Sequence, residues 1–276
     1  MDRDKNNSVA DLQTLSQEVQ DVVREASSIM LEAEDQAEQS TRKSNRSDLV
    51  TVYDVRVQEH LEKELLRIFP EAGFMGEEDD VRDIAGKRYY FIVDPIDGTL
   101  NFVLDYRHSA ISVALAEDTG SGPQVVLAVC FNPYLDEMFT AIRGEGAKLN
   151  GAPIEAAERE LADSVVLFGT SPYQREYTDQ TFEAVKEFYK RCSDVRRSGA
   201  AVLDICYIAA GRGDLFYEMG LAPWDYAAAS LIVEEAGAVV TDLEGKPLSI
   251  TGKSGVLAGP PHQHEAALDL LREIFG

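Results

Sequence analysis

The most informative stretch of the chain reads Val93-Asp94-Pro95-Ile96-Asp97-Gly98-Thr99-Leu100-Asn101-Phe102. Two acids emerge here from residues 89–93, an aromatic and β-branched run typical of a buried strand. Pro95 fixes φ between the acids, so the turn is stiff and holds their carboxylates in a set relation. A helix or tight turn that starts at Gly98 would leave backbone N–H groups free to bind phosphate. Carboxylates that gather hard cations beside such amides indicate metal-assisted phosphoryl chemistry, and the alternative for this motif alone is an ordinary acidic turn.

The chain after this stretch divides into two patterns. Strand candidates at residues 110–116, 125–131 and 137–142 follow one another closely, which favours an antiparallel meander, and Asn150-Gly151 is a turn signal. Beyond it, helices and strands alternate: strands are expected at 165–168, 214–218, 238–241 and 256–258, and helices at 179–191, 199–210, 225–236 and 264–275. We therefore predict an α+β lobe over residues 1–150 and an α/β lobe over residues 151–276, packed as one unit of layered sheets and helices.

Two helices are expected before the first strand. Ser8 with Asp11 resembles a capping box. An apolar stripe of about three heptads follows, which predicts a helix packed on the core, with a coiled coil as the alternative. It comprises Leu12, Leu15, Val19, Val22, Ala26, Ile29 and Ala33. Residues 40–47 are polar and lack periodicity, which predicts a loop. A second helix is expected over residues 54–69, with Pro70 just past its end.

Composition limits the classes of function. The 276 residues include 26 Lys and Arg against 49 Asp and Glu, a formal charge of −23. Such a field repels nucleic-acid polymers and anionic membrane surfaces and favours a protein that collects divalent cations. Three separated cysteines form neither a C-x-x-C pair nor a disulfide framework, so we expect a reducing compartment. No signal peptide and no run of 18 apolar residues is present, and the expected location is the cytoplasm.

Two further acidic motifs accompany the first. Gly76-Glu77-Glu78 follows an apolar turn that contains glycine, and alone it reads as a solvated charge run. Trp224-Asp225 precedes a helical pattern, and alone Asp225 reads as an N-cap beside a core tryptophan. All three motifs occur together, in order and at suitable separations, and this combination favours a functional role for their acids.

Taken jointly, the motifs resemble those of the inositol monophosphatase family. The family's G-E-E, D-P-I-D-G-T-x-N-F and W-D-x-A-A motifs match residues 76–78, 94–102 and 224–228. Further matches are Lys43, Asp48-Leu49-Val50-Thr51 with Asp54, and Glu218-Met219-Gly220, so the resemblance runs from about Lys43 to Gly237. It implies an αβαβα layered sandwich, usually a homodimer, that hydrolyses phosphate monoesters with Mg²⁺ and is sensitive to lithium.

The resemblance also implies roles for individual residues. Glu77, Asp94 and the Ile96 carbonyl would hold a first Mg²⁺, and Asp94, Asp97 and Asp225 a second, with Glu77 serving a third site through water. Thr99, paired with Asp54, would orient and deprotonate the attacking water, and no covalent intermediate would form. The remaining residues would bind substrate: Gly98, Thr99, Gly199, Ala200, Glu218 and Lys43, for which a plain surface lysine is the alternative.

Departures from the family pattern concern the substrate. Ala200 stands where the family often has threonine, and Leu100 where a second threonine is common. An exclusive preference for inositol phosphate is therefore not implied, and relatives also cleave sugar phosphates, 3′-phosphoadenosine nucleotides and NADP. Arg196-Arg197 fits either a second phosphate or a solvated basic pair. The Glu218 carboxylate, which accepts hydrogen bonds from hydroxyls and repels a second phosphate, favours hydroxyl-rich monophosphates modestly. A third reading is a regulatory binding protein on the same fold.

Overall fold

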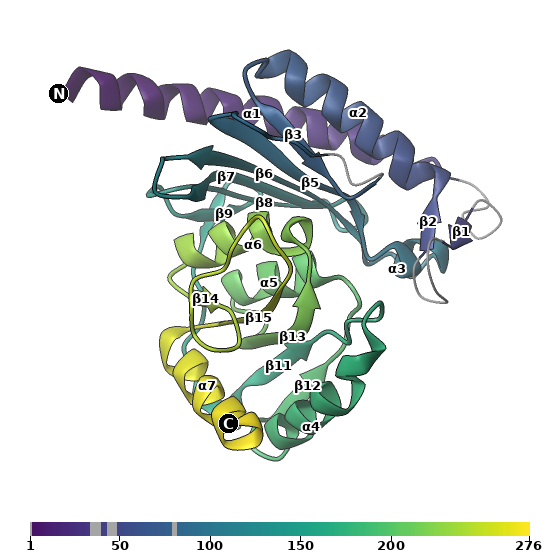
Figure 1. The fold of residues 1–276 in the computed structure, drawn as a ribbon, viewed down its shortest axis with the longest axis vertical. Coiled ribbons are helices and arrows are strands. Elements are labelled where there is room, and N and C mark those ends of the chain that lie inside the picture. Colours follow the sequence, from purple (N-terminus) through teal and green to yellow (C-terminus); the bar gives the residue numbers. More distant parts are fainter. Residues whose placement is uncertain (1, 34–39, 43–48, 79–81) are drawn as a thin grey trace.

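Five layers of helices and sheets make up the molecule (Figure 1). The computed structural model describes residues 2–33, 40–42, 49–78 and 82–276. From one side to the other, the layers are a pair of helices, an eight-stranded sheet, a second pair of helices, a five-stranded sheet and a third pair of helices. This arrangement confirms the predicted αβαβα sandwich.

The eight-stranded sheet is built on the predicted meander. Strands β5 (Tyr89–Asp97), β6 (Ala110–Asp118), β7 (Pro123–Asn132) and β8 (Glu137–Ile142) pair antiparallel in chain order. The sheet continues through β9 (Ala147–Leu149) and β10 (Ala152–Ile154), which are joined at Asn150-Gly151. On the other side β3 (Gly73–Gly76) runs parallel to β5, and β4 (Arg82–Asp83) pairs with β3. The sequence did not predict β3, β4, β9 or β10.

The five-stranded sheet contains the strands of the alternating half. Its order is β12 (Asp194–Arg196), β11 (Val165–Phe168), β13 (Leu215–Leu221), β15 (Ser254–Gly259) and β14 (Val239–Thr241). The first three strands are parallel, and β15 is antiparallel to both β13 and β14. Of these, only β12 was not predicted.

The helices cover both sheets. Helices α1 (Asp2–Leu31) and α2 (Val52–Ile68) lie on the outer face of the large sheet, and α5 (Ala201–Ala209) and α6 (Pro223–Glu235) fill the space between the sheets. Helices α4 (Thr178–Tyr189) and α7 (Pro261–Phe275) cover the far face of the smaller sheet. Most α6 residues are buried on every side, as expected of a helix enclosed between two sheets.

Strand β5 explains why both faces of the large sheet are covered. Successive side chains of a strand point to opposite faces. Phe91 and Val93 accordingly enter the cluster formed with α1 and α2, whereas Tyr90 and Ile92 enter the cluster formed with α5 and α6. The buried apolar run predicted at residues 89–93 is therefore the junction of the two large cores.

Three expectations for the first 70 residues need correction or comment. The stripe Leu15, Val19, Val22 and Ala26 is buried against α2 and the sheet, so packing on the core is confirmed for α1. The predicted start at Ser8 is wrong, because the helix begins at Asp2. The predicted loop is wrong for residues 40–42, which form β1 (Ser40–Arg42) and pair with β2 (Leu49–Thr51). Residues 43–48, with Lys43, lie outside the described residues.

Within the described parts of the chain, no helix is long and apolar enough to cross a membrane.

A deletion in the core tests this packing. Phe91→Ala is expected to lower the free energy of unfolding by about 3–5 kcal/mol, because the ring is fully buried and its loss leaves a cavity. Chemical denaturation measures the change. Tyr189→Ala is the control, since that side chain is 60% exposed and its loss should cost within about 0.5 kcal/mol. Equal losses in the two variants would contradict the placement of β5.

Candidate active site

Most of the predicted site residues line one cavity of about 200 Å³. It lies where the end of β5 meets the N-terminal ends of α5 and α6 and the loop after β11. The predicted residues in its wall are Glu77, Asp94, Ile96, Asp97, Gly98, Thr99, Gly199, Ala200, Glu218 and Asp225. Asp54 is absent from the wall and lies behind Thr99. The structure thus brings together residues that are up to 148 positions apart, counted from Glu77 to Asp225.

A break in β5 brings two of the acids to the same cavity. Residues three apart on a regular strand face opposite sides. Between Asp94 and Asp97, however, the pairing of β5 with β6 shifts register, and the Ile96 N–H donates to Asp94 Oδ1 at 3.0 Å. Both carboxylates therefore reach the cavity, and both are almost fully buried.

Strand β3 delivers Glu77 to Asp94. The parallel pairing of β3 with β5 ends at Gly76 opposite Val93, so Glu77 follows directly beside Asp94. Gln58 of α2 fixes this position: its amide donates to the Glu78 carbonyl at 2.9 Å and accepts from the Glu78 N–H at 2.8 Å. A Cβ at Gly76 would lie only 2.4 Å from Gln58 Oε1, which explains the glycine.

Helix N-termini hold the other two acids. Asp97 Oδ2 accepts a hydrogen bond of 2.9 Å from Val202 N–H in the first turn of α5. Asp225 lies in the first turn of α6 and accepts from Ala222 N–H at 2.7 Å. The N-terminal end of a helix favours negative charge, so each carboxylate is placed where its ionised form is stabilised.

These contacts do not offset the cost of bringing the acids together. Burial raises the pKa of Asp94 well above its usual range, and the charges of Glu77, Asp97 and Asp225 raise it further. Burial and the charge of Asp225 likewise raise the pKa of Asp97. Burial raises the pKa of Asp225 to about 6, although the Ala222 N–H opposes the change. The four acids therefore repel one another inside a single buried space.

A hard divalent cation fits this donor set. Four carboxylates and the Ile96 carbonyl offer the oxygen ligands that Mg²⁺ prefers, and a cation would neutralise their repulsion. Within the described ranges, no three His, Cys, Asp or Glu side chains already form a group arranged to hold a metal ion. The electrostatic coupling of the four acids nevertheless fits a cation site, because carboxylates that repel one another have no reason to close up without a cation.

Thr99 and Asp54 form a second polar unit behind the acids. Thr99 Oγ1 lies 3.3 Å from Asp54 Oδ1 and 3.2 Å from the Ile96 carbonyl. Asp54 Oδ2 accepts from both the N–H and the hydroxyl of Thr51, at 2.7 and 2.5 Å, in a capping box at the start of α2. Burial raises the Asp54 pKa to about 6, while the Thr51 bonds act in the opposite direction. Asp54 is therefore mainly ionised at neutral pH and faces the threonine hydroxyl.

The loop after β5 is braced against the turn before α5. Gly98 has φ of +82°, and a Cβ there would lie 3.2 Å from the Gly199 carbonyl and 3.1 Å from the His108 carbonyl. The Asn101 amide donates to the His108 carbonyl at 2.8 Å and to the Ser198 carbonyl at 3.1 Å. Asn101 and Gln58 are positioning residues that the sequence reasoning missed. For Asn101 the signal was its place in the D-P-I-D-G-T-x-N-F motif.

Glu218 lies in the cavity wall but is held tightly. The residue is 4% exposed, and its carboxylate accepts from Ser171 N–H at 2.7 Å. A Cβ at Gly169 would lie 1.8 Å from this carboxylate, so the loop and the acid are packed directly together. Burial raises the Glu218 pKa to about 8, against the lowering effect of the Ser171 bond and of Arg197.

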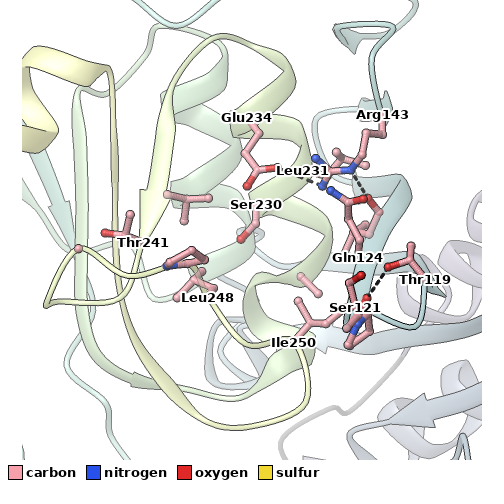
Figure 2. A pocket seen from close by; sticks show the side chains of 17 residues that line it. Thr119, Ser121, Gln124, Arg143, Ser230, Leu231, Glu234, Thr241, Leu248 and Ile250 are labelled. Atoms are coloured by element: carbon pink, nitrogen blue, oxygen red, sulfur yellow. Dashed lines mark hydrogen bonds and ion pairs between the residues drawn. The ribbon is translucent and has the colours of Figure 1, made fainter.

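A larger pocket elsewhere has a different character. It has a volume of about 550 Å³ and lies against another face of α6, beside the β6–β7 turn (Figure 2). Glu234 is the one acid in its described lining, and it is paired with Arg143 at 3.1 Å. Because its described lining holds no group of carboxylates, this pocket offers less to bind a metal than the smaller cavity does.

Known proteins share the motifs and the fold. A model of the inositol monophosphatase family matches residues 8–275. The chain belongs to the inositol monophosphatase family. It is 34% identical over 244 residues to Nus factor SuhB of Escherichia coli, which covers 88% of each chain. It is also similar to an IMPase structure from Thermotoga maritima, with 30% identity, a TM-score of 0.82 and coverage of 92% of this chain and 95% of that one.

A third relative bears on the metal. A structure of an IMPase/NADP phosphatase complexed with Mg²⁺ and phosphate is 26% identical, with a TM-score of 0.75 and coverage of 88% of this chain and 87% of that one. Family membership supports phosphatase chemistry for this chain, and the relative with Mg²⁺ and phosphate supports a role for Mg²⁺ in the family.

The raised pKa values predict how pH acts on the metal-free protein. Asp204 and Glu218 have folded pKa values of about 7 and 8, above those of the unfolded chain, so the folded state binds these protons more tightly. Their contribution to stability is complete at acid pH and is lost as pH rises through 7 and 8. His108 and His264, whose pKa values are lowered, oppose this trend only while the unfolded chain still protonates them, and they are neutral in both states above pH of about 7.5.

We therefore expect the melting temperature to fall between pH of about 6.5 and 8 in the presence of chelator. Each group contributes up to about 1.4 kcal/mol per pH unit between its two pKa values. Excess Mg²⁺ should flatten the profile, because a cation stabilises the ionised acids. Calorimetry over this range is the measurement, with Glu218→Gln as the variant that reduces the slope. A melting temperature that rises with pH in chelator would contradict the assignment.

Proposed function

We propose that this protein is a Mg²⁺-dependent phosphate monoesterase that resembles inositol-1-monophosphatase and uses activated water. The observation that supports this most directly is the meeting of Glu77, Asp94, Asp97 and Asp225 in one cavity beside Gly98 and Thr99. In this proposal water attacks the phosphorus directly, and no covalent intermediate with the protein forms. The substrate is a small phosphate ester, with inositol 1-phosphate as the first candidate.

Two overlapping sets of ligands would hold the cations. Glu77, Asp94 and the Ile96 carbonyl form the first set, and Asp94, Asp97 and Asp225 form the second, with Glu77 reaching a third ion through water. When bound, Mg²⁺ lowers the pKa of the attacking water and stabilises charge on the departing oxygen. Asp97 and Asp225 keep their orientation through the N–H groups of Val202 and Ala222.

Thr99 would act on the water. As the Thr99 hydroxyl passes its own proton to Asp54 Oδ1, its oxygen would take a proton from the attacking water, so that Thr99 stays neutral and Asp54 ends protonated. Asp54 is suited to this task because Thr51 holds its other oxygen and its pKa of about 6 keeps it ionised at neutral pH. The N–H groups of Gly98 and Thr99, at the start of α3 (Thr99–Val103), would bind the phosphate oxygens.

The alcohol part of the ester would contact Gly199, Ala200 and Glu218, and Lys43 would approach once metal and substrate are bound. A carboxylate such as Glu218 accepts hydrogen bonds from sugar or inositol hydroxyls. The cavity volume of about 200 Å³ lies below the range of about 300–1,000 Å³ for drug-sized ligands, which favours a small alcohol over a dinucleotide.

The same chemistry on 3′-phosphoadenosine nucleotides, NADP or sugar bisphosphates is the second candidate. The relative described as an IMPase/NADP phosphatase supports it. A regulatory binding role is the third, and the name Nus factor SuhB carried by the relatives is the observation in its favour. A panel of phosphate esters assayed with Mg²⁺ and with chelator distinguishes the three, because a binding protein releases no phosphate from any of them.

We also propose that the protein is a cytoplasmic homodimer. Leu31, Leu104, Tyr106 and Leu135 are more than half exposed. Leu31 lines a groove at the end of α1 together with Asp105, Arg107, Pro133 and Tyr134, and the other three are sequence neighbours of these lining residues. Large exposed apolar side chains gathered in one place are typical of an interface. The three cysteines are free, which fits a reducing compartment. A monomeric mass in sedimentation experiments would contradict the dimer.

Removing one acid tests the cation sites. Asp97→Asn deletes a charged ligand and should lower kcat/KM by at least about 100-fold when Mg²⁺ is limiting. Asp163→Asn is a matched control, because that residue lies in a short turn far from the cavity lining. Activity of Asp97→Asn close to that of the wild type would exclude the two-ion assignment. Inhibition by lithium, which the family resemblance implies, can be titrated in the same assay.

The second test concerns the water. Thr99→Ala should lower kcat by about 100-fold or more and change KM little, because the hydroxyl acts on the nucleophile rather than on the bound ester. Steady-state kinetics separate the two parameters, and Thr99→Ser should restore most of the rate. An effect confined to KM would instead assign Thr99 to phosphate binding.

A further inference from the structure

One acid in the wall of the active-site cavity has no part in the reaction proposed above. Asp204 of α5 lines the same cavity as the four acids that would hold the cations. The residue is only 1% exposed, and its Oδ1 has no hydrogen-bond partner among the described residues. Such an acceptor is costly to bury, because it has lost water without gaining a hydrogen bond. Asp204 therefore keeps an acceptor available for a ligand that enters the cavity.

Asp204 is close to both functional ends of the cavity. Burial is the main cause of the raised pKa values of Asp97, a cation ligand, and of Glu218, at the alcohol end, and the charge of Asp204 adds to both. Burial also raises the pKa of Asp204 itself to about 7, while a hydrogen bond from Ser198 and the charge of Arg197 act in the opposite direction. Because charges interact strongly only at short range in a protein surrounded by water, Asp204 lies near the junction between the cations and the alcohol.

The small side chain of Ala200 leaves room for a ligand group to approach Asp204. The Asp204 N–H donates to the Ala200 carbonyl at 3.1 Å, so the two residues are one helical turn apart. Side chains four residues apart are neighbours on a helix, and both of these residues line the cavity. The threonine that the family often has at position 200 would add atoms beside Asp204. In this chain a carboxyl group one turn farther along can take the place of the missing hydroxyl.

We propose that Asp204 accepts a hydrogen bond from a hydroxyl group on the alcohol part of the ester, and that this contact makes the protein selective for small polyol phosphates. The inference rests on the proposed function and adds a specificity-determining residue to it. A carboxyl group can accept from a hydroxyl in either protonation state. Glu218 is already engaged by Ser171 N–H and packed against Gly169, whereas Asp204 retains an unused buried oxygen.

Two esters of the same ring size, with and without hydroxyl groups, test the proposal. Inositol 1-phosphate is compared with cyclohexyl phosphate by kcat/KM for phosphate release at saturating Mg²⁺. The wild type should prefer the inositol ester. Asp204→Ala should lower kcat/KM for inositol 1-phosphate by about 10- to 100-fold, because a hydrogen bond to a charged group is lost, and for cyclohexyl phosphate by less than about threefold.

Stability distinguishes a ligand contact from a structural role. An ionised buried acid without a partner opposes folding, so Asp204→Asn should raise the melting temperature at pH 8 in chelator. Asp214→Ala is the matched control, because Asp214 is also 1% exposed but is bound by Arg159 and by Val165 N–H. Its loss should lower the melting temperature and leave the ester preference unchanged. A lower melting temperature for Asp204→Asn would identify Asp204 as a structural acid and overturn the proposal.

The dependence on Mg²⁺ distinguishes the alcohol contact from a role at the cations. For Asp204→Ala, the Mg²⁺ concentration that gives half-maximal hydrolysis of cyclohexyl phosphate should stay within about threefold of the wild-type value. Equal losses on the two esters, together with a higher requirement for Mg²⁺, would assign Asp204 to the cation sites instead of the alcohol.

Binding measurements keep this test separate from the proposed function. Calorimetry with the Thr99→Ala protein and Mg²⁺ measures affinity for the two esters without rapid turnover. Affinity for inositol 1-phosphate that depends on Asp204, in a protein whose wild type releases no phosphate from any ester, would support the contact and refute the enzyme. Phosphate release by the wild type with equal kcat/KM for both esters would support the enzyme and overturn the role of Asp204.

Discussion

Repulsion between buried carboxylates is the constraint around which the molecule is organised. Asp94, Asp97, Asp225 and Glu77 share one small space: the charges of the other three raise the pKa of Asp94, and the charge of Asp225 raises that of Asp97. A buried charge without a partner is costly, so the chain must hold these groups in place with interactions that remain when the cation is absent. It does so with backbone N–H groups: those of Ile96, Val202 and Ala222 each bind one of the aspartates. The acids are thus oriented before any cation binds.

Holding the acids through these backbone N–H groups requires the layered architecture. Asp97 ends a strand of the large sheet, yet its hydrogen-bond donor belongs to α5, which lies between the two sheets. Asp225 is carried by α6, which contacts β5, β6 and β7 on one side and β15 on the other. Glu77 follows a strand that is held by Gln58 of the outer helix α2. The outer helix α2, the large sheet and the helices between the sheets each contribute a group that positions an acid, and the cavity exists only when these layers are assembled.

The sequence predicted those parts in which local pattern and tertiary contact agree. Strands 137–142 and 165–168 were predicted to the residue, because runs of buried apolar side chains are distinct from the turns around them. Strand β3 was missed because its residues are Gly-Phe-Met-Gly, and glycine is depleted in strands. Glycine is required in β3 because residues elsewhere in the sequence pack directly against its backbone: a Cβ at Gly73 would lie 2.2 Å from the Asp83 carbonyl. The cavity residues were predicted from the family motifs, whereas Gln58 looked like any polar residue of a helix until its partner 20 positions away was in view.

The charges that give this site its affinity for a cation also lower the stability of the fold. Neutral side chains in place of Asp94, Asp97 and Asp225 would remove the repulsion that opposes folding, and with it the affinity for a cation. Protons and cations compete for these oxygens, so low pH stabilises the folded chain by protonating the acids, and Mg²⁺ does the same near neutral pH by coordinating them. Arg197 extends this logic to the mouth of the cavity, where a positive charge lies within reach of Asp204 and Glu218 without forming an ion pair with either.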